Sequence, residues 1–146
     1  AEIRAACVED LPGLDQCAAE FYASSRFLTA FNPEAFRAAW TALQDSGAGV
    51  IFLLGGAEID GAIGGVAYPD INSGALVATT EFFWFVRPAM RGHGLALYKR
   101  FEDWARAKGC RKIQMVYLLD SMPERLDRIY QRLGFQAAEV HYVKEI

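Results

Sequence analysis

The sequence predicts an α/β fold in which helices pack against a mixed β-sheet. Runs of β-branched and aromatic residues alternate with stretches whose apolar residues recur at helical spacing. Turn and capping residues separate the two kinds of segment, and the predicted order is β-α-α-β-β-β-α-β-α-β-β. A chain of 146 residues is long enough for an ordinary core, so we expect a single domain over residues 1–146.

The helices are predicted from start signals that precede apolar stripes. Asp10 and Asn32 suit N-caps, and a proline follows each of them at an early helical position. Gly109 and Gly134 suit the ends of the last two helices. Helices are therefore expected at residues 10–24, 32–45, 95–108 and 123–133.

The strands are predicted from short apolar runs bounded by turn residues, such as the pair Gly55-Gly56. Strands are expected at residues 3–8, 50–54, 59–68, 76–86, 112–119, 135–138 and 141–146.

Composition excludes several classes of protein. An apolar share of 53% excludes a disordered chain, and a net charge of −3 gives no general attraction to nucleic acid or anionic lipid. The three cysteines lack metal-ligand spacing, so we expect reduced thiols, no metal site and a cytoplasmic location. We expect no membrane segment and no secretory signal.

The most informative segment follows the strand predicted at residues 76–86 and opens the third helix. A helix start exposes backbone N–H groups that have no partner within the helix, and its dipole end is positive. Two glycines allow an anion to approach the backbone, and an arginine adds charge, so the segment predicts a pyrophosphate cradle. It reads Arg91-Gly92-His93-Gly94-Leu95-Ala96.

Two common nucleotide motifs do not fit this segment. A P-loop ends in Gly-Lys-Ser/Thr, which is missing from these residues. A dinucleotide fingerprint needs a third glycine or alanine where Leu97 stands, and it usually belongs to the first strand–helix unit of a longer domain.

A third pattern fits, and it is supported by a second motif. Residues 91–96 read Arg-x-x-Gly-x-Ala after a strand that carries Val86-x-Pro88, and Tyr130 precedes Leu133-Gly134-Phe135. These motifs resemble the acetyl-coenzyme A loop and the second signature of the GNAT N-acetyltransferase superfamily, with a matching element order over nearly the whole chain. The resemblance implies a mostly antiparallel sheet of about six or seven strands, flanked by about four helices.

The resemblance also implies roles for individual residues. Backbone N–H groups across Arg91–Ala96 would hold the pyrophosphate, and the strand edge near Phe85 and Val86 would bind the pantetheine arm. Tyr130 matches the tyrosine that protonates the leaving thiolate. Pro123 stands where many members carry an asparagine, so any side-chain contact with coenzyme A from that position is lost.

Attack on the thioester needs a neutral amine, and a carboxylate can take its proton. Glu81 is the candidate base because it is the only charged residue between Asn72 and Arg87. A structural carboxylate is the alternative interpretation. Asp120 and His141 are weaker candidates.

Two aromatic residues near the first two helices, Phe27 and Phe31, are candidates for lining the acceptor site. The alternative is that they cover the sheet as part of the core. Tyr130 has a corresponding alternative as a core tyrosine, and His141 as a histidine facing solvent.

The resemblance implies an acyltransferase that moves an acetyl group from acetyl-coenzyme A, its co-substrate, to a primary amine by direct attack in a ternary complex. The acceptor would be a small molecule or a peptide amine, and a homodimer is common in this family. The alternative is a non-catalytic acyl-coenzyme A-binding sensor or interaction module. Binding of nucleic acid is disfavoured because there is no extended basic stripe.

Overall fold

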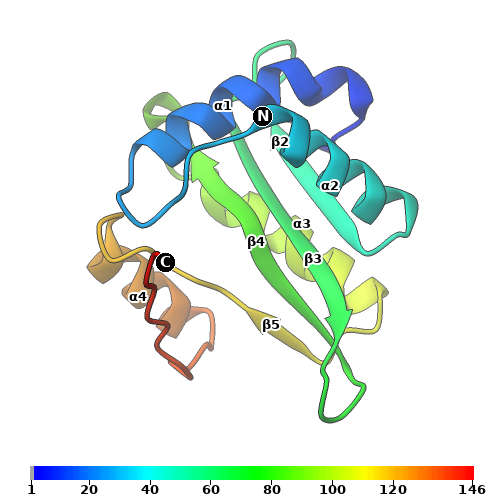
Figure 1. The fold of residues 1–146 in the computed structure, drawn as a ribbon, viewed down its shortest axis with the longest axis vertical. Coiled ribbons are helices and arrows are strands. Elements are labelled where there is room, and N and C mark those ends of the chain that lie inside the picture. The colour runs from blue at the N-terminus through cyan, green and yellow to red at the C-terminus, as the bar shows by residue number, and fades with distance from the viewer. Residues whose placement is uncertain (1) are drawn as a thin grey trace.

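A five-stranded sheet forms the centre of the computed structural model, in which the strands lie side by side in chain order (Figure 1). Residues 2–80 and 83–146 are described throughout, and of Glu81 and Phe82 only their place in a strand. The strands are β1 (Ile3–Ala5), β2 (Gly49–Leu54), β3 (Gly61–Pro69), β4 (Leu76–Val86) and β5 (Lys112–Gln114). The first four pair antiparallel, and β5 pairs parallel to β4, so the sheet is mixed as predicted.

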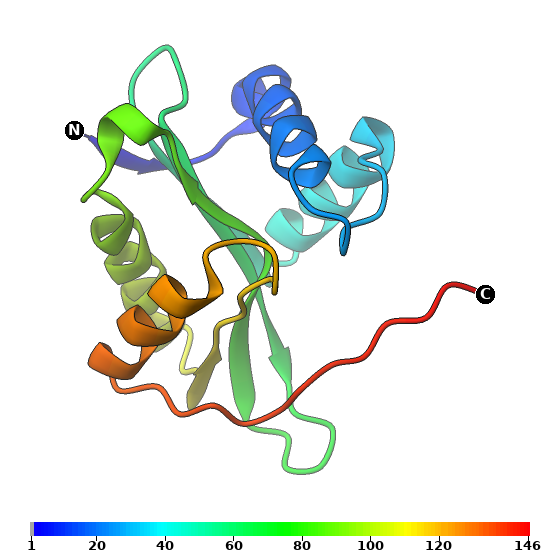
Figure 2. The ribbon, with the colours of Figure 1, turned by 90° about the vertical axis from the view of Figure 1, so that its left-hand side faces the viewer.

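Helices cover both faces of this sheet (Figure 2). α1 (Leu11–Ala23) and α2 (Pro33–Asp45) lie on one face, and α3 (Gly94–Ala107) and α4 (Pro123–Arg132) lie on the other. Two short 3-10 turns, η1 (Val8–Asp10) and η2 (Pro88–Met90), precede α1 and α3. The predicted N-cap Asn32 accepts a hydrogen bond from the Ala35 N–H at 3.1 Å.

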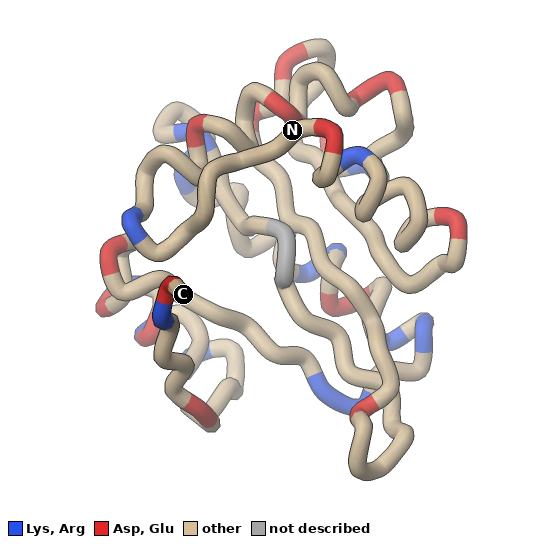
Figure 3. The backbone as a smooth tube through the Cα atoms, viewed as in Figure 1, with Lys and Arg blue, Asp and Glu red and all other residues tan. Residues whose placement is uncertain are grey.

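The core has two halves because the central strands bury both faces. Along β2, Ile51 and Leu53 pack with α1 and α2, whereas Phe52 and Leu54 pack with α3. Side chains alternate between the faces of a strand, so one apolar run supplies both halves. Lys and Arg positions are interspersed with Asp and Glu positions along the described backbone (Figure 3).

β4 pairs differently along its two halves. Its residues Val77, Ala78 and Thr79 pair with β5, and no β5 partner is described for its residues from Phe83 onward. Gly64 pairs with Phe83, and Val66 pairs with Thr79. Between these two pairs β3 spans two residues and β4 spans four, so the register shifts where pairing with β5 ends. β4 and β5 then diverge (Figure 1).

The predicted fold class and all four helices are confirmed, and the main differences lie after α3. β5 ends at Gln114 instead of continuing to residue 119, and the closing strands expected at 135–138 and 141–146 are not formed in the described chain. A strand needs a neighbouring edge, and the short β5 offers little of one. The last segment instead extends from the body with exposed Val140 and Tyr142 (Figure 2).

No helix within the described ranges combines the length and apolar character needed to cross a membrane.

Gly65 lies at the register shift, where an added methyl group has no room. Its Cβ would clash with the Thr79 carbonyl oxygen and lie 2.7 Å from the Phe101 ring. We expect Gly65→Ala to lower the free energy of unfolding by about 2–3 kcal/mol, as overpacking of a core does. Urea denaturation measures this.

Gly56→Ala is the matched control, because nothing lies within 4 Å of a Cβ at that position. Its effect should stay within about 0.5 kcal/mol. Equal stability of the two variants would show that the core around Gly65 can accommodate a methyl group.

Candidate active site

The predicted pyrophosphate cradle lies between the end of β4 and the start of α3. η2 leads the chain away from the strand, and Gly92 turns it with a φ of 98°. That left-handed conformation favours glycine because a Cβ would be strained there. α3 begins at Gly94, one residue before the expected start, so the predicted strand, turn and helix follow in order.

Three backbone donors at this turn are free to bind an anion. Within the described chain, the N–H groups of Gly92, Gly94 and Leu95 donate to no protein acceptor, whereas those of His93 and Ala96 bond to backbone carbonyls at 3.1 and 3.2 Å. Gly92, Leu95 and Ala96 are exposed. The positive end of the α3 dipole reinforces these donors, so the turn can hold a phosphate group.

Contacts with β4 hold the first turn of α3 in place. The Trp84 indole Nε1 donates to the Gly94 carbonyl oxygen at 3.2 Å. A Cβ on Gly94 would lie 3.4 Å from Val86 Cγ2 and 3.7 Å from Trp84 Nε1, which is ordinary contact distance. The helix start therefore packs directly on the strand that precedes it.

The edge of β4 that leads to this turn can accept an extended ligand. Phe85 pairs with Ala62 and Val86 with Gly61, both on β3. On the other edge, no partner strand is described at this level, and β5 has already diverged (Figure 1). Unpaired backbone groups on a strand edge can bond an added extended chain.

Tyr130 projects from α4 toward the diverging strands. Its hydroxyl donates to the Val116 carbonyl oxygen at 2.6 Å. Its ring stacks between Trp84, at a centroid distance of 6.2 Å, and Tyr117, at 6.4 Å. Burial raises the pKa of this phenol above its usual value, so Tyr130 holds its proton at neutral pH.

The three base candidates have different surroundings. Glu81 belongs to β4 near the register shift, and its side chain lies outside the described residues. Asp120 is engaged with both carboxylate oxygens: Oδ1 accepts from Ser25 Oγ at 2.7 Å and Oδ2 accepts from the Arg26 N–H at 3.1 Å. The Ser25 hydrogen bond is the main cause that lowers the pKa of Asp120. His141 is exposed and contacts Glu139 at 2.8 Å.

The candidate acceptor residues differ in burial. Phe31 is half-buried, and its ring lies 5.5 Å from Tyr22 and 5.5 Å from Phe36, so it packs within the aromatic layer of the α1–α2 face. Phe27 is 37% exposed, with the Arg26 guanidinium 4.9 Å from its ring centroid. Of the two residues, Phe27 is the more exposed.

One cavity of about 240 Å³ adjoins the end of β4, and sequence reasoning missed it. Arg87 lines this cavity, and its side chain is held in place because its Nε donates to the Ile59 carbonyl oxygen at 2.9 Å. Burial raises the pKa of the Cys17 thiol, so this cysteine is a poor nucleophile. An arginine at a strand end next to proline was the available signal. The cavity is lined by Cys17, Glu20, Phe21, Ser24, Phe85, Val86, Arg87 and Pro88.

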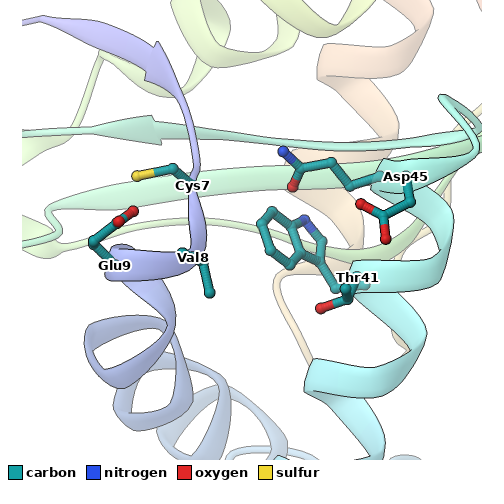
Figure 4. Close-up of a pocket in the computed structure, with 7 residues that line it drawn as sticks. Cys7, Val8, Glu9, Thr41 and Asp45 are labelled. Carbon is teal, nitrogen blue, oxygen red and sulfur yellow. The ribbon is translucent and has the colours of Figure 1, made fainter.

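A second cavity of about 240 Å³ lies between the N-terminal segment and α2 (Figure 4). Its lining includes Cys7, Glu9, Trp40 and Asp45, and it shares no lining residue with the cradle. No group of three or more His, Cys, Asp or Glu side chains with the geometry of a metal site occurs in the described part of the chain.

Solved structures share this fold over the whole chain. A transcriptional regulator from Bacillus halodurans is 23% identical, with a TM-score of 0.76 and coverage of 99% of each chain. AAC(6')-Iy in complex with the bisubstrate analogue CoA-S-monomethyl-acetylneamine is 20% identical, with a TM-score of 0.75 and coverage of 99% of this chain and 98% of the other. Glucosamine-6-phosphate N-acetyltransferase from Arabidopsis thaliana is 14% identical, with a TM-score of 0.75 and coverage of 99% and 97%.

These structures share the fold, and the family follows from the sequence. No curated protein sequence matches the chain. The profile of the Acetyltransferase (GNAT) family matches residues 16–135, which include the cradle, the free edge of β4 and Tyr130. The chain therefore belongs to the acetyltransferase (GNAT) family.

Proposed function

We propose that this chain transfers an acetyl group from acetyl-coenzyme A to a primary amine by direct attack in a ternary complex. The observation that carries the proposal is the continuity of two binding features: the unpaired edge of β4 leads directly into the three free N–H groups of Gly92, Gly94 and Leu95. An extended thioester arm that ends in a pyrophosphate matches both features.

The cradle would bind the donor through its backbone. The free N–H groups and the dipole of α3 would hold the pyrophosphate, with Arg91 adding positive charge at the exposed turn. The edge at Phe85 and Val86 would pair with the amides of the pantetheine arm. A β4 N–H group near the thioester would also stabilise the negative oxygen that forms when the amine adds to the carbonyl.

Two side chains are proposed for the proton transfers. Glu81, directly or through a water molecule, would take a proton from the alkylammonium so that the nitrogen lone pair can attack the thioester carbonyl. The carbon–sulfur bond then breaks, and Tyr130 would give its proton to the departing thiolate. The nitrogen would lose its second proton to solvent, from which Tyr130 would regain its own. For this, the Tyr130 hydroxyl must turn from the Val116 carbonyl to the sulfur.

The raised pKa of Tyr130 bears on this step. A phenol with a higher pKa is a weaker acid, so burial alone makes the proton transfer less favourable. The same apolar surroundings destabilise a thiolate, which raises the pKa of the leaving thiol as well. The two effects oppose each other, and the transfer depends on how both groups are solvated together.

A non-catalytic acyl-coenzyme A-binding module is the second candidate, and the bond from Tyr130 to Val116 favours it. In that arrangement the hydroxyl serves the fold, as a buried tyrosine commonly does. The cradle is common to both candidates, so only turnover separates them. The acceptor is proposed to be a small-molecule or peptide amine, and a cationic one suits the net charge of −3.

The cradle can be tested by removing one backbone donor from α3. Leu95→Pro deletes a free N–H in the first helical turn, where proline is tolerated best. A lost hydrogen bond to a charged group costs about 1.5–3 kcal/mol, so the dissociation constant for coenzyme A should rise about 10- to 100-fold in calorimetry.

Leu95→Ala is the matched control, because it removes the same half-exposed side chain and keeps the N–H. Its affinity should stay within about twofold of the wild type. Equal affinities in the two variants, with helix content preserved by circular dichroism, would place the pyrophosphate elsewhere.

Tyr130→Phe tests the proton donor. It keeps the stacked ring and removes the hydroxyl, so kcat should fall by about 10²- to 10⁴-fold while coenzyme A affinity stays unchanged. The measurement is thiol release from acetyl-coenzyme A in the presence of putrescine, glucosamine and a lysine-containing peptide.

Tyr117→Phe is the control for the same ring stack, and it should retain activity. Tight coenzyme A binding with no thiol release by the wild type across these amines would favour the binding module. An unchanged kcat in Tyr130→Phe would exclude Tyr130 as the proton donor.

A further inference from the structure

Asp120 joins two loops that lie far apart in the sequence. It belongs to the segment between β5 and α4, and its partners Ser25 and Arg26 belong to the segment between α1 and α2. Ser25 is only 8% exposed, so its hydroxyl is held inside this contact. Both Asp120 carboxylate oxygens accept a hydrogen bond from this loop, one from a side chain and one from the backbone.

The contact lies at the end of the molecule where β4 and β5 have diverged. The segment after α1 and the segment before α4 approach each other there, and the sheet itself provides no connection between them (Figure 1). The hydrogen bonds of Asp120 therefore connect the α1–α2 face to the α3–α4 face at that end.

Each loop carries a residue tied to the proposed site. On one side, the Phe27 N–H donates to Ser25 Oγ at 3.1 Å, so the contact with Asp120 fixes the backbone of the candidate acceptor residue. On the other side, Val116 accepts from the Tyr130 hydroxyl. One carboxylate thus joins the loop of Phe27 to the segment that accepts the hydrogen bond of Tyr130.

The backbone two residues after Asp120 adopts a strained conformation. Met122 has φ 48° and ψ 48°, the only positive φ at a non-glycine position among the described residues. Such a conformation costs of the order of 1 kcal/mol and persists where surrounding contacts enforce it. The two bonds of Asp120 and the Ser121 N–H bond to the Leu118 carbonyl are contacts of this kind.

We propose that Asp120 is a positioning residue that builds the acceptor site by tying the loop of Ser25 and Phe27 to the segment that contacts Tyr130. This rests on the proposed function. It assigns Asp120 no proton transfer, because both of its oxygens already accept hydrogen bonds.

The test compares Asp120→Ala and Ser25→Ala with the wild type, using the amine among putrescine, glucosamine and the lysine-containing peptide that the wild type acetylates fastest. The KM for that amine should rise about tenfold in both variants, the equivalent of one lost hydrogen bond to a charged group. The KM for acetyl-coenzyme A should stay within about twofold, and the pH profile of kcat should keep its limbs. In Ser25→Thr, which retains the hydroxyl, the KM for the amine should return close to the wild-type value.

Asp127→Asn is the matched control, since Asp127 is a half-buried carboxylate on α4 whose one described hydrogen bond comes from Gln131 Nε2, at 2.8 Å. It should leave both KM values unchanged. If Asp120→Ala instead lowers kcat and removes the acidic limb of the pH profile, Asp120 is a base and the positioning role is overturned.

A second measurement needs no turnover. In hydrogen exchange of the full chain, Asp120→Ala should speed the amides of Arg26 and Phe27, and those of residues 115–122, by about tenfold together. Faster exchange confined to residues 115–122 would overturn the proposal. Absence of thiol release by the wild type would overturn the proposed function alone, and the exchange result would still show whether Asp120 joins the two loops.

Discussion

The parallel pairing of β4 with β5 stops after three residue pairs, and the candidate site depends on this early stop. A strand bonded on both edges has no backbone groups left for a ligand. Beyond Thr79, β4 keeps its antiparallel partner β3, which holds it rigid, while its other edge is left for an extended molecule. The register shift against β3 occurs at the same level, so one short stretch of β4 changes both its pairing and its alignment. The free edge then ends where the first turn of α3 offers its unbonded N–H groups.

Aromatic side chains adapt the core to this divergence. Where β5 no longer covers β4, the Trp84, Tyr130 and Tyr117 rings stack across the α4 side. They give Tyr130 an apolar environment, which keeps its proton in place and also determines how readily it can be released. Stability and the proposed proton transfer therefore make opposite demands on the same hydroxyl. A tyrosine bonded to a backbone carbonyl is well suited to hold the fold, and it could act as the proposed proton donor only after that bond is exchanged for another.

Local signals in the sequence predicted much of this arrangement. Asn32 with its proline marks the start of α2, and the turn of the proposed cradle could be located from Arg91, Gly94 and Ala96 because it is a single local turn. The length of β5 could not be read, since Val116 and Tyr117 have strand propensity and only the tertiary structure turns them toward Tyr130. The contacts of Asp120 were equally hidden, because its partners lie 95 and 94 positions earlier in the chain. The final apolar segment shows the same limit: its composition favours a strand, but pairing depends on an edge elsewhere.

Trp84 has a further consequence for how the molecule can be observed. Its indole bonds to the first residue of α3 and stacks on Tyr130, so it is in contact with both ends of the proposed donor site. The other two tryptophans have different environments: Trp40 of α2 is 3% exposed in the core, and Trp104 stacks on Phe101 within α3. Indole emission depends on the polarity and hydrogen bonding around the ring. The chain thus carries an intrinsic optical reporter beside the proposed cradle, whereas no contact described for the other two indoles involves a cradle residue.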